Sequence, residues 1–468
     1  MPANSWPEDD SYKELEPLNS LLSDLSATEE SVLEARDLSL PSRFQGRRGK
    51  AALVLTVVWS GTIALHLASW GSIFILGLTT LLGIHALVVV FAKPRRHQKE
   101  IQGDLPFISI LVAAKNEEAV IGKLVKNLCS LEYPVGQYEV WIIDDHSTDK
   151  TPSVLAELAQ EYKQLQVLRR SAQASGGKSG ALNQVLPLTK GEIIAVFDAD
   201  AQVETDLLFQ VVPLFQREKV GAVQVRKAIA NAKENFWTKG QMSEMALDTW
   251  FQQQRVALGG IGELRGNGQF VRRTALESWG GWNEETITDD LDMTLRLHLD
   301  NWDIECTFYP AVQEEGVTNA LALWHQRNRW AEGGYQRYLD YWDLILKNRM
   351  GTRKTWDLLI FMLTMYILPT AAIPDILMAI ARHRLPILGP VTGLSMTISV
   401  LGMFAGLKRI RQEQPFQVFT PFVLLLQTVR GSLYMLHWLV VMSSTTARMS
   451  FRPKRLKWVK TVHTGSGE

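Results

Sequence analysis

Two apolar runs without any acidic or basic side chain constrain this chain more than any other feature. Residues 51–70 and 71–92 contain no Asp, Glu, Lys or Arg. At a rise of ~1.5 Å per residue, each run is about long enough to cross a hydrocarbon core ~30 Å thick. Almost nothing separates the two runs, so residues 50–92 are predicted to form a transmembrane helical hairpin.

The charges around this hairpin predict its orientation. The basic residues on its two flanks are Arg43, Arg47, Arg48 and Lys50 before it and Lys93, Arg95, Arg96 and Lys99 after it. Because Lys and Arg are enriched on the cytoplasmic side of membrane helices, we expect both ends of the hairpin in the cytoplasm. Residues 1–42 are acidic, polar and without sustained periodicity, which predicts a disordered tail.

Three more apolar blocks, residues 358–381, 385–407 and 416–443, predict C-terminal transmembrane helices within residues 358–445. Asp375 lies in the first block and Arg430 near the centre of the last. A charge at the bilayer midplane costs ~2.5–3.5 kcal/mol, so Arg430 predicts that the last block is broken. The basic residues of the tail, 446–468, favour a cytoplasmic C-terminus and an even number of crossings.

The overall charge excludes one class of partner. The chain has 49 Lys and Arg against 49 Asp and Glu, so its formal net charge is 0. No global positive field attracts nucleic acid, and we expect none as a partner. The expected partner is the lipid bilayer, with the chain as an integral multi-pass membrane protein.

Between the membrane blocks, residues 105–318 alternate between strand and helix patterns. Strands are expected at 107–113, 138–143, 166–169 and 192–197, and helices at 117–131, 151–163 and 179–186. Short β-branched apolar runs of this kind are typical of buried parallel strands. The alternation predicts an α/β domain with a doubly wound, mostly parallel sheet, whose ligands bind beyond the carboxyl ends of the strands.

Two pairs of carboxylates follow two of these strands. Asp144 and Asp145 can accept hydrogen bonds from a nucleoside, although capping of the next helix by Ser147, Thr148 or Asp149 explains part of that motif. Asp198 and Asp200 stand two positions apart on an extended segment and therefore point the same way. A divalent cation that bridges them to a diphosphate resolves their repulsion, and Mg²⁺ suits such a site, with Mn²⁺ as the alternative. An acidic turn exposed to solvent is the competing interpretation.

Three further motifs carry polar side chains of the kind that bind or activate a substrate. Lys178 follows two glycines at the start of a helix, where free N–H groups favour an anion, and a flexible surface loop is the alternative. Asn267 stands between Gly266 and Gly268 and could line an acceptor pocket or an ordinary turn. Asp289 and Asp290 open another helix, where acidic residues are favourable anyway. One of them could act as a general base on an acceptor hydroxyl, and we favour Asp290.

The segment 319–348 is aromatic and amphipathic, which predicts interfacial helices under the membrane. It contains Gln326, Arg329 and Trp330. Arg329 could stabilise diphosphate charge, and Trp330 could stack on a sugar face. Interfacial anchoring and snorkelling explain Arg337 and most of the aromatic residues equally well.

The ordered set Asp144-Asp145, Lys178, Asp198-x-Asp200, Thr288-Asp-Asp290 and Gln326-x-x-Arg329-Trp330 resembles glycosyltransferase family 2. More narrowly, it is similar to the membrane-bound branch that includes the cellulose and hyaluronan synthases. Over its whole length the chain looks most like the cyanobacterial members of this family that glucosylate a bilayer lipid. One departure is Asp289, which stands where the family usually has Glu.

The resemblance implies a GT-A fold and an inverting, single-displacement mechanism. It implies that Asp144 and Asp145 bind uridine and that Asp198 and Asp200 hold Mg²⁺ and diphosphate. Asp290 would deprotonate the acceptor, and Gln326, Arg329 and Trp330 would cover the UDP. The implied reaction moves glucose from UDP-glucose to the sn-3 hydroxyl of 1,2-diacylglycerol in a cyanobacterial thylakoid or plasma membrane, with the catalytic domain cytoplasmic. A processive polysaccharide synthase is the alternative.

Overall fold

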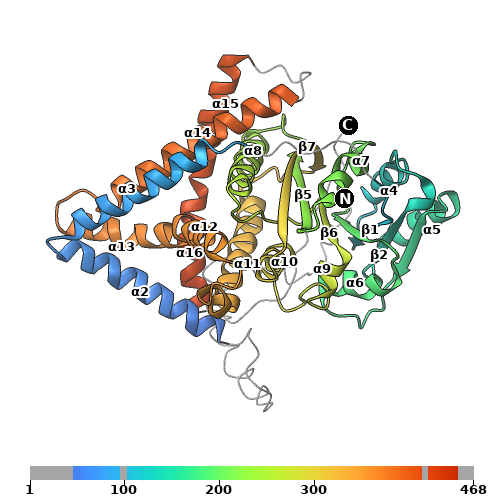
Figure 1. Ribbon diagram of the computed structural model, residues 1–468, viewed down its shortest axis with the longest axis horizontal. Helices are drawn as coiled ribbons and strands as arrows, with labels where there is room; N and C mark the ends of the chain where they lie inside the picture. The colour runs from blue at the N-terminus through green and yellow to red at the C-terminus, as the bar shows by residue number, and fades with distance from the viewer. Residues whose placement is uncertain (1–45, 95–102, 414–419, 452–468) are drawn as a thin grey trace, which may run out of the picture.

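The computed structural model describes residues 46–94, 103–413 and 420–451. The predicted acidic tail and residues 452–468 of the predicted basic tail lie outside these ranges. Long helices gather at one end of the molecule and an α/β domain forms the other (Figure 1). Between them lie helices α8 (Phe236–Ala257), α10 (Asp289–Leu299) and α11 (Ala320–Leu346). The arrangement therefore presents one side of the α/β domain to the apolar helices.

The α/β domain contains a seven-stranded sheet in the order β3-β2-β1-β4-β6-β5-β7. Its strands are β1 (Ile108–Ala114), β2 (Tyr138–Asp144), β3 (Leu165–Arg169), β4 (Ile193–Phe197), β5 (Val220–Ile229), β6 (Gln269–Arg272) and β7 (Asp303–Glu314). Only β6 runs antiparallel to its neighbours β4 and β5. The prediction of a mostly parallel α/β sheet is confirmed, and the antiparallel β6 is a feature that the sequence pattern did not indicate.

The register of the sheet brings the predicted acidic motifs to one edge. Ala114 at the end of β1 pairs with Asp144, and Val112 pairs with Phe197 at the end of β4. Because these three strands are parallel, the loops that follow them leave the sheet side by side. Asp145 and Asp198 therefore begin loops on either side of the loop that follows β1.

Helices cover both faces of the sheet, as expected for a doubly wound fold. On one face α4 (Ile121–Cys129), α5 (Thr151–Glu161) and α7 (Leu207–Val211) contribute to a core with β1, β2 and β4. On the other face α6 (Gly177–Val185), α9 (Arg273–Glu277) and α10 (Asp289–Leu299) contribute to a second core, which contains residues of β1, β2 and β4 and also of β5, β6 and β7. Three predicted helices correspond to α4, α5 and α6, with ends shifted by a few residues.

Two longer helices lie between the sheet and the apolar helices. They are α8 (Phe236–Ala257) and α11 (Ala320–Leu346). None of the predicted helices covers the residues of α8, whose polar side chains form no apolar stripe. Most of its polar side chains, including Gln252, Gln254 and Arg255, are buried. They find hydrogen-bond partners inside the protein instead of facing water.

Helix α11 differs from the amphipathic surface helix that its aromatic residues predicted. Tyr338, Tyr341 and Ile345 are buried in a cluster with Leu295 and Leu299 of α10. The interpretation of Arg337 as a snorkelling residue is wrong, because its side chain is 2% exposed and lies 2.8 Å from the carboxylate of Glu263. The helix is therefore part of the protein core along much of its length.

Within the described residues, five helical segments are long and apolar enough to cross a membrane. The first two are α2 (Arg47–Leu67) and α3 (Gly71–Val90), which correspond to the predicted hairpin. The other three are Thr352–Ala381, Gly389–Gln412 and Pro421–Phe451. They contain α12 (Thr352–Met362), α13 (Leu368–Ala381), α14 (Gly389–Glu413), α15 (Pro421–Met435) and α16 (His437–Phe451). Three segments after residue 351 do not establish an even number of crossings, which stays a prediction.

Both charged residues in the C-terminal apolar blocks have structural explanations. Asp375 accepts hydrogen bonds from the N–H groups of Ile387 and Leu388, and its Oδ1 lies 2.6 Å from Nε2 of His66. It therefore closes the turn between α13 and α14 and links them to α2. The last block is divided at Leu436 into α15 and α16, so the predicted break is present. Arg430 itself lies inside α15, where it donates a hydrogen bond of 3.0 Å to Gln427.

Candidate active site

The structure brings Lys178 to the predicted metal-binding carboxylates. Lys178 lies in the first turn of α6, and its Nζ is 2.5 Å from Oδ1 of Asp198. Burial alone would lower the pKa of Lys178, but Asp198, Asp289 and Asp290 together raise it. Lys178 is therefore within electrostatic reach of acidic residues that stand far apart in the sequence.

Arg329 faces the same group of carboxylates from α11. Burial lowers the pKa of Arg329, against the opposing effects of Asp198, Asp290 and Asp289. The pKa of Asp198 is lowered because Lys178, Lys227 and Arg329 outweigh its burial. The loops after β4 and before α10 therefore share one charged site with α6 and α11.

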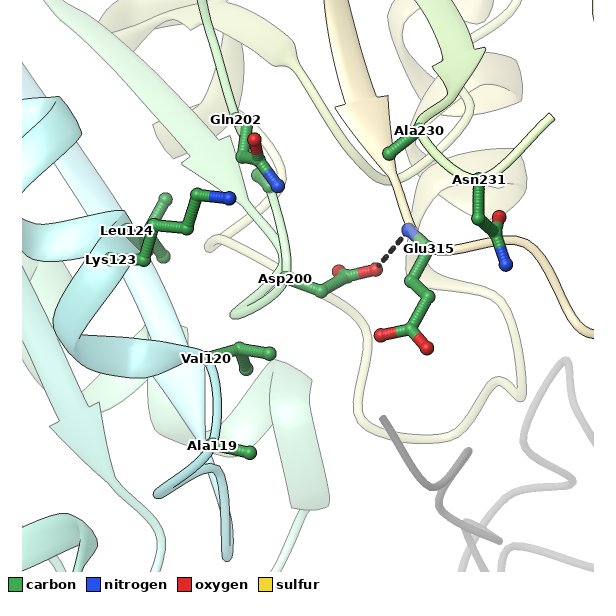
Figure 2. A pocket seen from close by; sticks show the side chains of 10 residues that line it. Ala119, Val120, Lys123, Leu124, Asp200, Gln202, Ala230, Asn231 and Glu315 are labelled. Carbon is green, nitrogen blue, oxygen red and sulfur yellow. Dashed lines mark hydrogen bonds between the residues drawn. The ribbon is translucent and has the colours of Figure 1, made fainter. Parts of the chain in front are cut away.

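Asp200 lies beside a pocket at one side of this site. Its Oδ2 accepts a hydrogen bond from the backbone N–H of Glu315 at 2.9 Å (Figure 2). The pocket is lined on one side by Ala119, Val120, Lys123 and Leu124 and on the opposite side by Ala230 and Asn231. Asp198 and Asp290 do not line it. Asp200 therefore faces both the shared charged site and a separate pocket.

The carboxylates around Asp200 could supply part of the coordination shell of a divalent cation, and a bound ligand would supply the rest. Burial, Glu314 and Asp198 raise the pKa of Asp200 to about 7. This repulsion between carboxylates is the kind that a bound cation relieves. In the described ranges, no three His, Cys, Asp or Glu side chains form a ready metal site. Mg²⁺ commonly binds one or two carboxylates and takes its remaining ligands from phosphate and water.

The motif after β2 is tied into the protein more firmly than the sequence predicted. Asp144 is 1% exposed, and its Oδ1 accepts a hydrogen bond from the N–H of Ser147. Asp145 accepts a hydrogen bond of 2.6 Å from Arg170, and its side chain is 19% exposed. Asp145 is thus the more accessible of the two, while Asp144 shapes the loop.

Of the three residues predicted to cap α5, one bonds to the first turn of the helix. Asp149 accepts a hydrogen bond from the N–H of Thr151, the first residue of α5. Ser147 and Thr148 do not cap the helix, because they bond to Asn116 in the loop after β1. The polar residues after β2 therefore join two adjacent loops at the sheet edge.

Asn267 lies inside the site and supports its loops. Its side chain is fully buried, and its Oδ1 accepts a hydrogen bond from the N–H of Asp198 at 3.2 Å. Gly266 and Gly268 have φ values of 81° and 71°, so the tight turn needs glycine at both positions. The contact of Asn267 with an acceptor stays a prediction, and its observed contact is with the Asp198 segment.

Asp289 and Asp290 form the N-terminal turn of α10. Burial and Asp289 raise the pKa of Asp290 to about 6, although the N–H of Leu291, Lys178 and Arg265 oppose this rise. In the described part of the chain, Oδ2 of Asp289 and Oγ1 of Thr288 are buried without a hydrogen-bond partner. Burying such polar atoms costs folding free energy unless a ligand or a water molecule forms the missing hydrogen bonds.

The close packing of α11 against this turn depends on a glycine. A Cβ atom at Gly333 would lie 2.2 Å from Oγ1 of Thr288. Only glycine therefore allows α11 to approach the residue that precedes Asp289 and Asp290. This contact places the first half of α11 beside the carboxylates.

Gln326 and Trp330 also lie in this first half of α11. The guanidinium carbon of Arg327 is 4.0 Å from the ring centre of Trp330, and Nζ of Lys227 is 5.0 Å from the same ring. Gln326 accepts a hydrogen bond from Arg327 at 2.5 Å. The observed contacts of both residues are therefore with cationic side chains of the protein, and their contacts with a substrate stay predictions.

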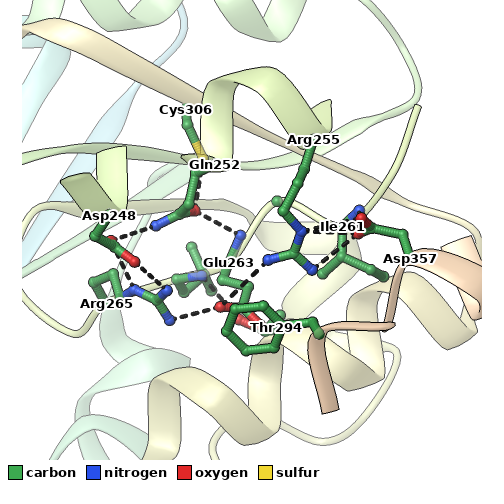
Figure 3. A network of polar contacts seen from close by, with 12 residues as sticks. Asp248, Gln252, Arg255, Ile261, Glu263, Arg265, Thr294, Cys306 and Asp357 are labelled. Atoms are coloured by element: carbon green, nitrogen blue, oxygen red, sulfur yellow. Dashed lines mark hydrogen bonds and ion pairs between the residues drawn. The ribbon is translucent and has the colours of Figure 1, made fainter. Parts of the chain in front are cut away.

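A buried network of charges lies behind the turn that holds Asn267. Glu263 is fully buried and lies 2.8 Å from Arg265 (Figure 3). It also lies 2.8 Å from Arg337. Despite its burial, these two guanidinium groups and Arg255 hold its pKa far below the ordinary value. Arg265 also lies 2.6 Å from Asp248 of α8. The network fixes the segment that leads into the Gly266–Gly268 turn.

The network extends from this segment to the membrane-side helices. Arg255 of α8 lies 2.9 Å from Asp357 of α12 (Figure 3). Asp357 also accepts a hydrogen bond from the N–H of Ile261. Helix α12 is therefore connected through buried charges to the loop beside the site.

Several charged residues of the site were missed by the sequence analysis. Glu314 lies at the end of β7, where it faces Asp200 and lies 3.0 Å from Lys227. A strand pattern at residues 303–313 followed by two acidic residues could have indicated it, by the same argument that identified Asp198. Glu263 and Arg265 had no such signal, because their partners come from distant segments.

Comparison with known proteins agrees with this architecture. Residues 106–333 match the family described as Glycosyltransferase like family 2. The chain is 86% identical over 468 residues to a β-monoglucosyldiacylglycerol synthase of Nostoc sp., with all of both chains covered. It is 54% identical over 476 residues to a β-monoglucosyldiacylglycerol synthase of Synechocystis sp., covering 100% of this chain and 98% of the relative.

A solved structure of a mannosyltransferase from Pyrobaculum calidifontis, in complex with GDP-Man and Mn²⁺, is also similar. Its sequence identity is 18% and its TM-score 0.46, with 86% of this chain and 96% of that chain covered. Glycosyltransferases with the GT-A fold typically use a divalent metal. Because residues 106–333 match this family and the whole chain is similar to the two synthases, the chain belongs to the glycosyltransferase-like family 2 and is a glycosyltransferase with a GT-A-like fold.

Proposed function

We propose that this protein transfers glucose from UDP-glucose to the sn-3 hydroxyl of 1,2-diacylglycerol, giving β-monoglucosyldiacylglycerol and UDP. The observation that carries the proposal is the 86% identity, over the full length, to a β-monoglucosyldiacylglycerol synthase. The shared site of Lys178, Asp198, Asp290 and Arg329 supports it independently, because it combines a candidate base with groups that bind phosphate.

Asp290 is the proposed general base. Its pKa of about 6 leaves it mostly ionised at neutral pH and still basic enough to take a proton from an acceptor hydroxyl. As the proton moves to Asp290, the acceptor oxygen attacks the anomeric carbon of glucose. The bond between that carbon and the diphosphate oxygen breaks on the opposite face, so the configuration inverts and UDP leaves.

The cationic side chains would stabilise the departing diphosphate. Lys178 and Arg329 lie where negative charge develops, and both already interact with the site's carboxylates. Asp198 and Asp200 would hold a divalent cation, for which we propose Mg²⁺, with Mn²⁺ as the alternative. When bound, this cation neutralises charge on the leaving diphosphate.

The remaining predicted residues would bind the substrates. Asp145 is accessible enough to accept hydrogen bonds from the uridine, and Asp144 holds the loop that presents it. The unpartnered Oδ2 of Asp289 would accept a hydrogen bond from a sugar hydroxyl. Gln326 and Trp330 would close over the bound UDP and glucose, with Asn267 beside the acceptor.

An acceptor that resides in the bilayer fits the position of the site. The apolar helical segments of the described ranges flank the α/β domain, and α11 connects the carboxylate site to them (Figure 1). We propose that residues 105–318 form the cytoplasmic catalytic domain and that residues 319–348 lie at the membrane interface. In this arrangement the acyl chains stay in the lipid while the hydroxyl reaches Asp290. The host membrane would be the thylakoid or plasma membrane of a cyanobacterium.

Product analysis with labelled donors tests the proposal. Purified protein in nanodiscs that contain diacylglycerol would be incubated with labelled UDP-glucose and, separately, UDP-galactose, with Mg²⁺, Mn²⁺ or a chelator. We expect one labelled β-glucosyl lipid from UDP-glucose, little product from UDP-galactose and none with the chelator. The lipid would be identified by thin-layer chromatography and mass spectrometry.

Two outcomes would contradict the proposal. Labelled polymer without glycolipid would instead indicate a polysaccharide synthase. A glycolipid with the α configuration would rule out the single-displacement mechanism. The Asp290→Asn variant is the control for product that does not come from this site.

A further inference from the structure

Two residues inside the Gln326–Trp330 segment, Arg327 and Asn328, have no role in the proposed reaction. Both are buried, and Arg327 is among the largest fully buried side chains of the protein. A guanidinium group without exposure is costly unless it is paired and hydrogen-bonded on several sides. The partners of Arg327 therefore indicate why the protein keeps a charge at this position.

The first group of partners belongs to the proposed site. Arg327 donates a 2.5 Å hydrogen bond to Oε1 of Gln326. Its guanidinium carbon also lies 4.0 Å from the ring centre of Trp330, well inside the ~6 Å range of a cation–π interaction. One buried cation thus contacts both of the residues proposed to cover the donor.

The second partner is Glu244 of α8, a carboxylate on which three elements converge. Glu244 is 7% exposed, and its Oε2 accepts hydrogen bonds from Arg327 at 2.5 Å and from the hydroxyl of Tyr434 at 2.9 Å. Its Oε1 accepts a hydrogen bond of 2.7 Å from Nε1 of Trp438. Tyr434 lies near the end of α15 and Trp438 near the start of α16, so Glu244 holds both sides of the break at Leu436.

We call the break between α15 and α16 at Leu436 the α15–α16 corner. Two further contacts attach α15 to α8 and α16 to α11. A Cβ atom at Gly240 of α8 would lie 2.2 Å from the ring of Tyr434, so α8 and α15 are in close contact. Arg448 of α16 donates a 2.5 Å hydrogen bond to Oδ1 of Asn328. Arg327 and Asn328 are therefore both attached to the last apolar segment, Pro421–Phe451.

We propose that Arg327 is a positioning residue that holds Gln326 and Trp330 over the donor, and that Glu244 makes their position depend on the α15–α16 corner. The inference rests on the proposed function and adds to it a connection between the membrane helices and donor binding. A disturbance at the corner reaches Trp330 through one carboxylate and one guanidinium group. Arg327 itself touches no substrate.

A pair of carboxylate-to-amide variants tests the proposal. Glu244→Gln keeps the size of the side chain but removes the charge that pairs with Arg327. Asp340→Asn is the matched control, because Asp340 is a buried carboxylate on α11 that pairs with Arg47 of α2, far from Gln326 along the helix. The assay measures kcat and KM for UDP-glucose, together with thermal unfolding, in nanodiscs that contain diacylglycerol.

We expect both variants to unfold at a lower temperature, whereas only Glu244→Gln alters the kinetics. For Glu244→Gln, KM for UDP-glucose should rise about 10-fold or more, the usual scale for loss of a charged hydrogen bond. Equal kinetic effects in the two variants, or an unchanged KM in Glu244→Gln, would overturn the proposal. Absence of any glycolipid from the wild-type protein would instead contradict the proposed function.

If Glu244→Gln does not fold, two milder variants test whether contacts at the α15–α16 corner affect KM for UDP-glucose. Tyr434→Phe removes one hydroxyl from the Glu244 contact and keeps the ring against Gly240. Trp438→Phe removes the indole donor from the α16 side. Each should raise KM for UDP-glucose about 3- to 10-fold, as expected for one hydrogen bond. Wild-type values of KM in both would overturn the coupling to the corner.

Discussion

Replacement of Asp290 by Asn should make the protein more stable while it removes activity. Burial and Asp289 raise the pKa of Asp290 from 3.8 to about 6. One pKa unit corresponds to about 1.4 kcal/mol, so ionised Asp290 costs about 3 kcal/mol of folding free energy at neutral pH. Asn cannot ionise and avoids this cost, but it also cannot accept the proton of an acceptor hydroxyl.

The raised pKa of Asp290 determines how the stability gained by Asp290→Asn changes with pH. The folded protein binds the proton of Asp290 more tightly than the unfolded chain does. The stabilisation from protonated Asp290 is therefore complete below pH 3.8 and is lost as pH rises to about 6. The stability gained by Asp290→Asn should be largest above pH 6 and should disappear toward pH 4. Wild-type activity should fall about tenfold per pH unit below pH 6, because the base becomes protonated.

The assay combines thermal unfolding from pH 4 to 8 with the rate of glycolipid formation. We expect Asp290→Asn to lose at least about 10²-fold in kcat and to unfold at a higher temperature than the wild type at pH 8. Asp292→Asn is the control on the same helix. Asp292 lies 2.6 Å from Arg296 and accepts a hydrogen bond from Tyr341, so its replacement should be destabilising. A fully active Asp290→Asn variant, or one that unfolds at a lower temperature than the wild type at pH 8, would refute the reasoning.

Three further predictions follow from the charges of the site. Lys178→Met should shift the acidic limb of the pH–rate profile to higher pH, because Lys178 lowers the pKa of Asp290; an unshifted profile would contradict this. Arg337→Met leaves Glu263 buried with one fewer partner and should cost about 3–5 kcal/mol of stability, measured by unfolding in detergent. Asp200→Asn should abolish the dependence of the rate on Mg²⁺ concentration together with most activity, whereas a normal Mg²⁺ titration would place the cation elsewhere.

The sheet illustrates what local sequence patterns can predict. The β1, β2 and β4 runs are apolar and β-branched, and each is followed by a polar loop. This pattern needs no distant partner, so it predicted the strands and the acidic motifs at their ends. The same holds for α2 and α3, because length and the absence of charge suffice to indicate a membrane hairpin.

Polar segments were predicted less well, because their structure depends on partners elsewhere in the chain. Helix α8 has no apolar stripe, and its buried side chains are satisfied by residues of the β7 strand, α12 and α11. Arg337 was interpreted as a membrane anchor, yet its partner Glu263 lies 74 positions away. A sequence pattern shows that such a residue is charged but not which charge it will meet.

The apolar hairpin, the strand–helix alternation and the acidic residues at the strand ends can be predicted from local sequence, since each is a periodic or compositional property of adjacent residues. Folding is needed to show that Lys178, Asp198, Asp290 and Arg329 share one site and that Glu314 joins Asp200. It is also needed to show that Arg327 connects Trp330 to the last apolar helices. The physical reason is that hydrophobic periodicity is local, whereas the pairing of buried charges depends on which distant segments the folded chain brings together.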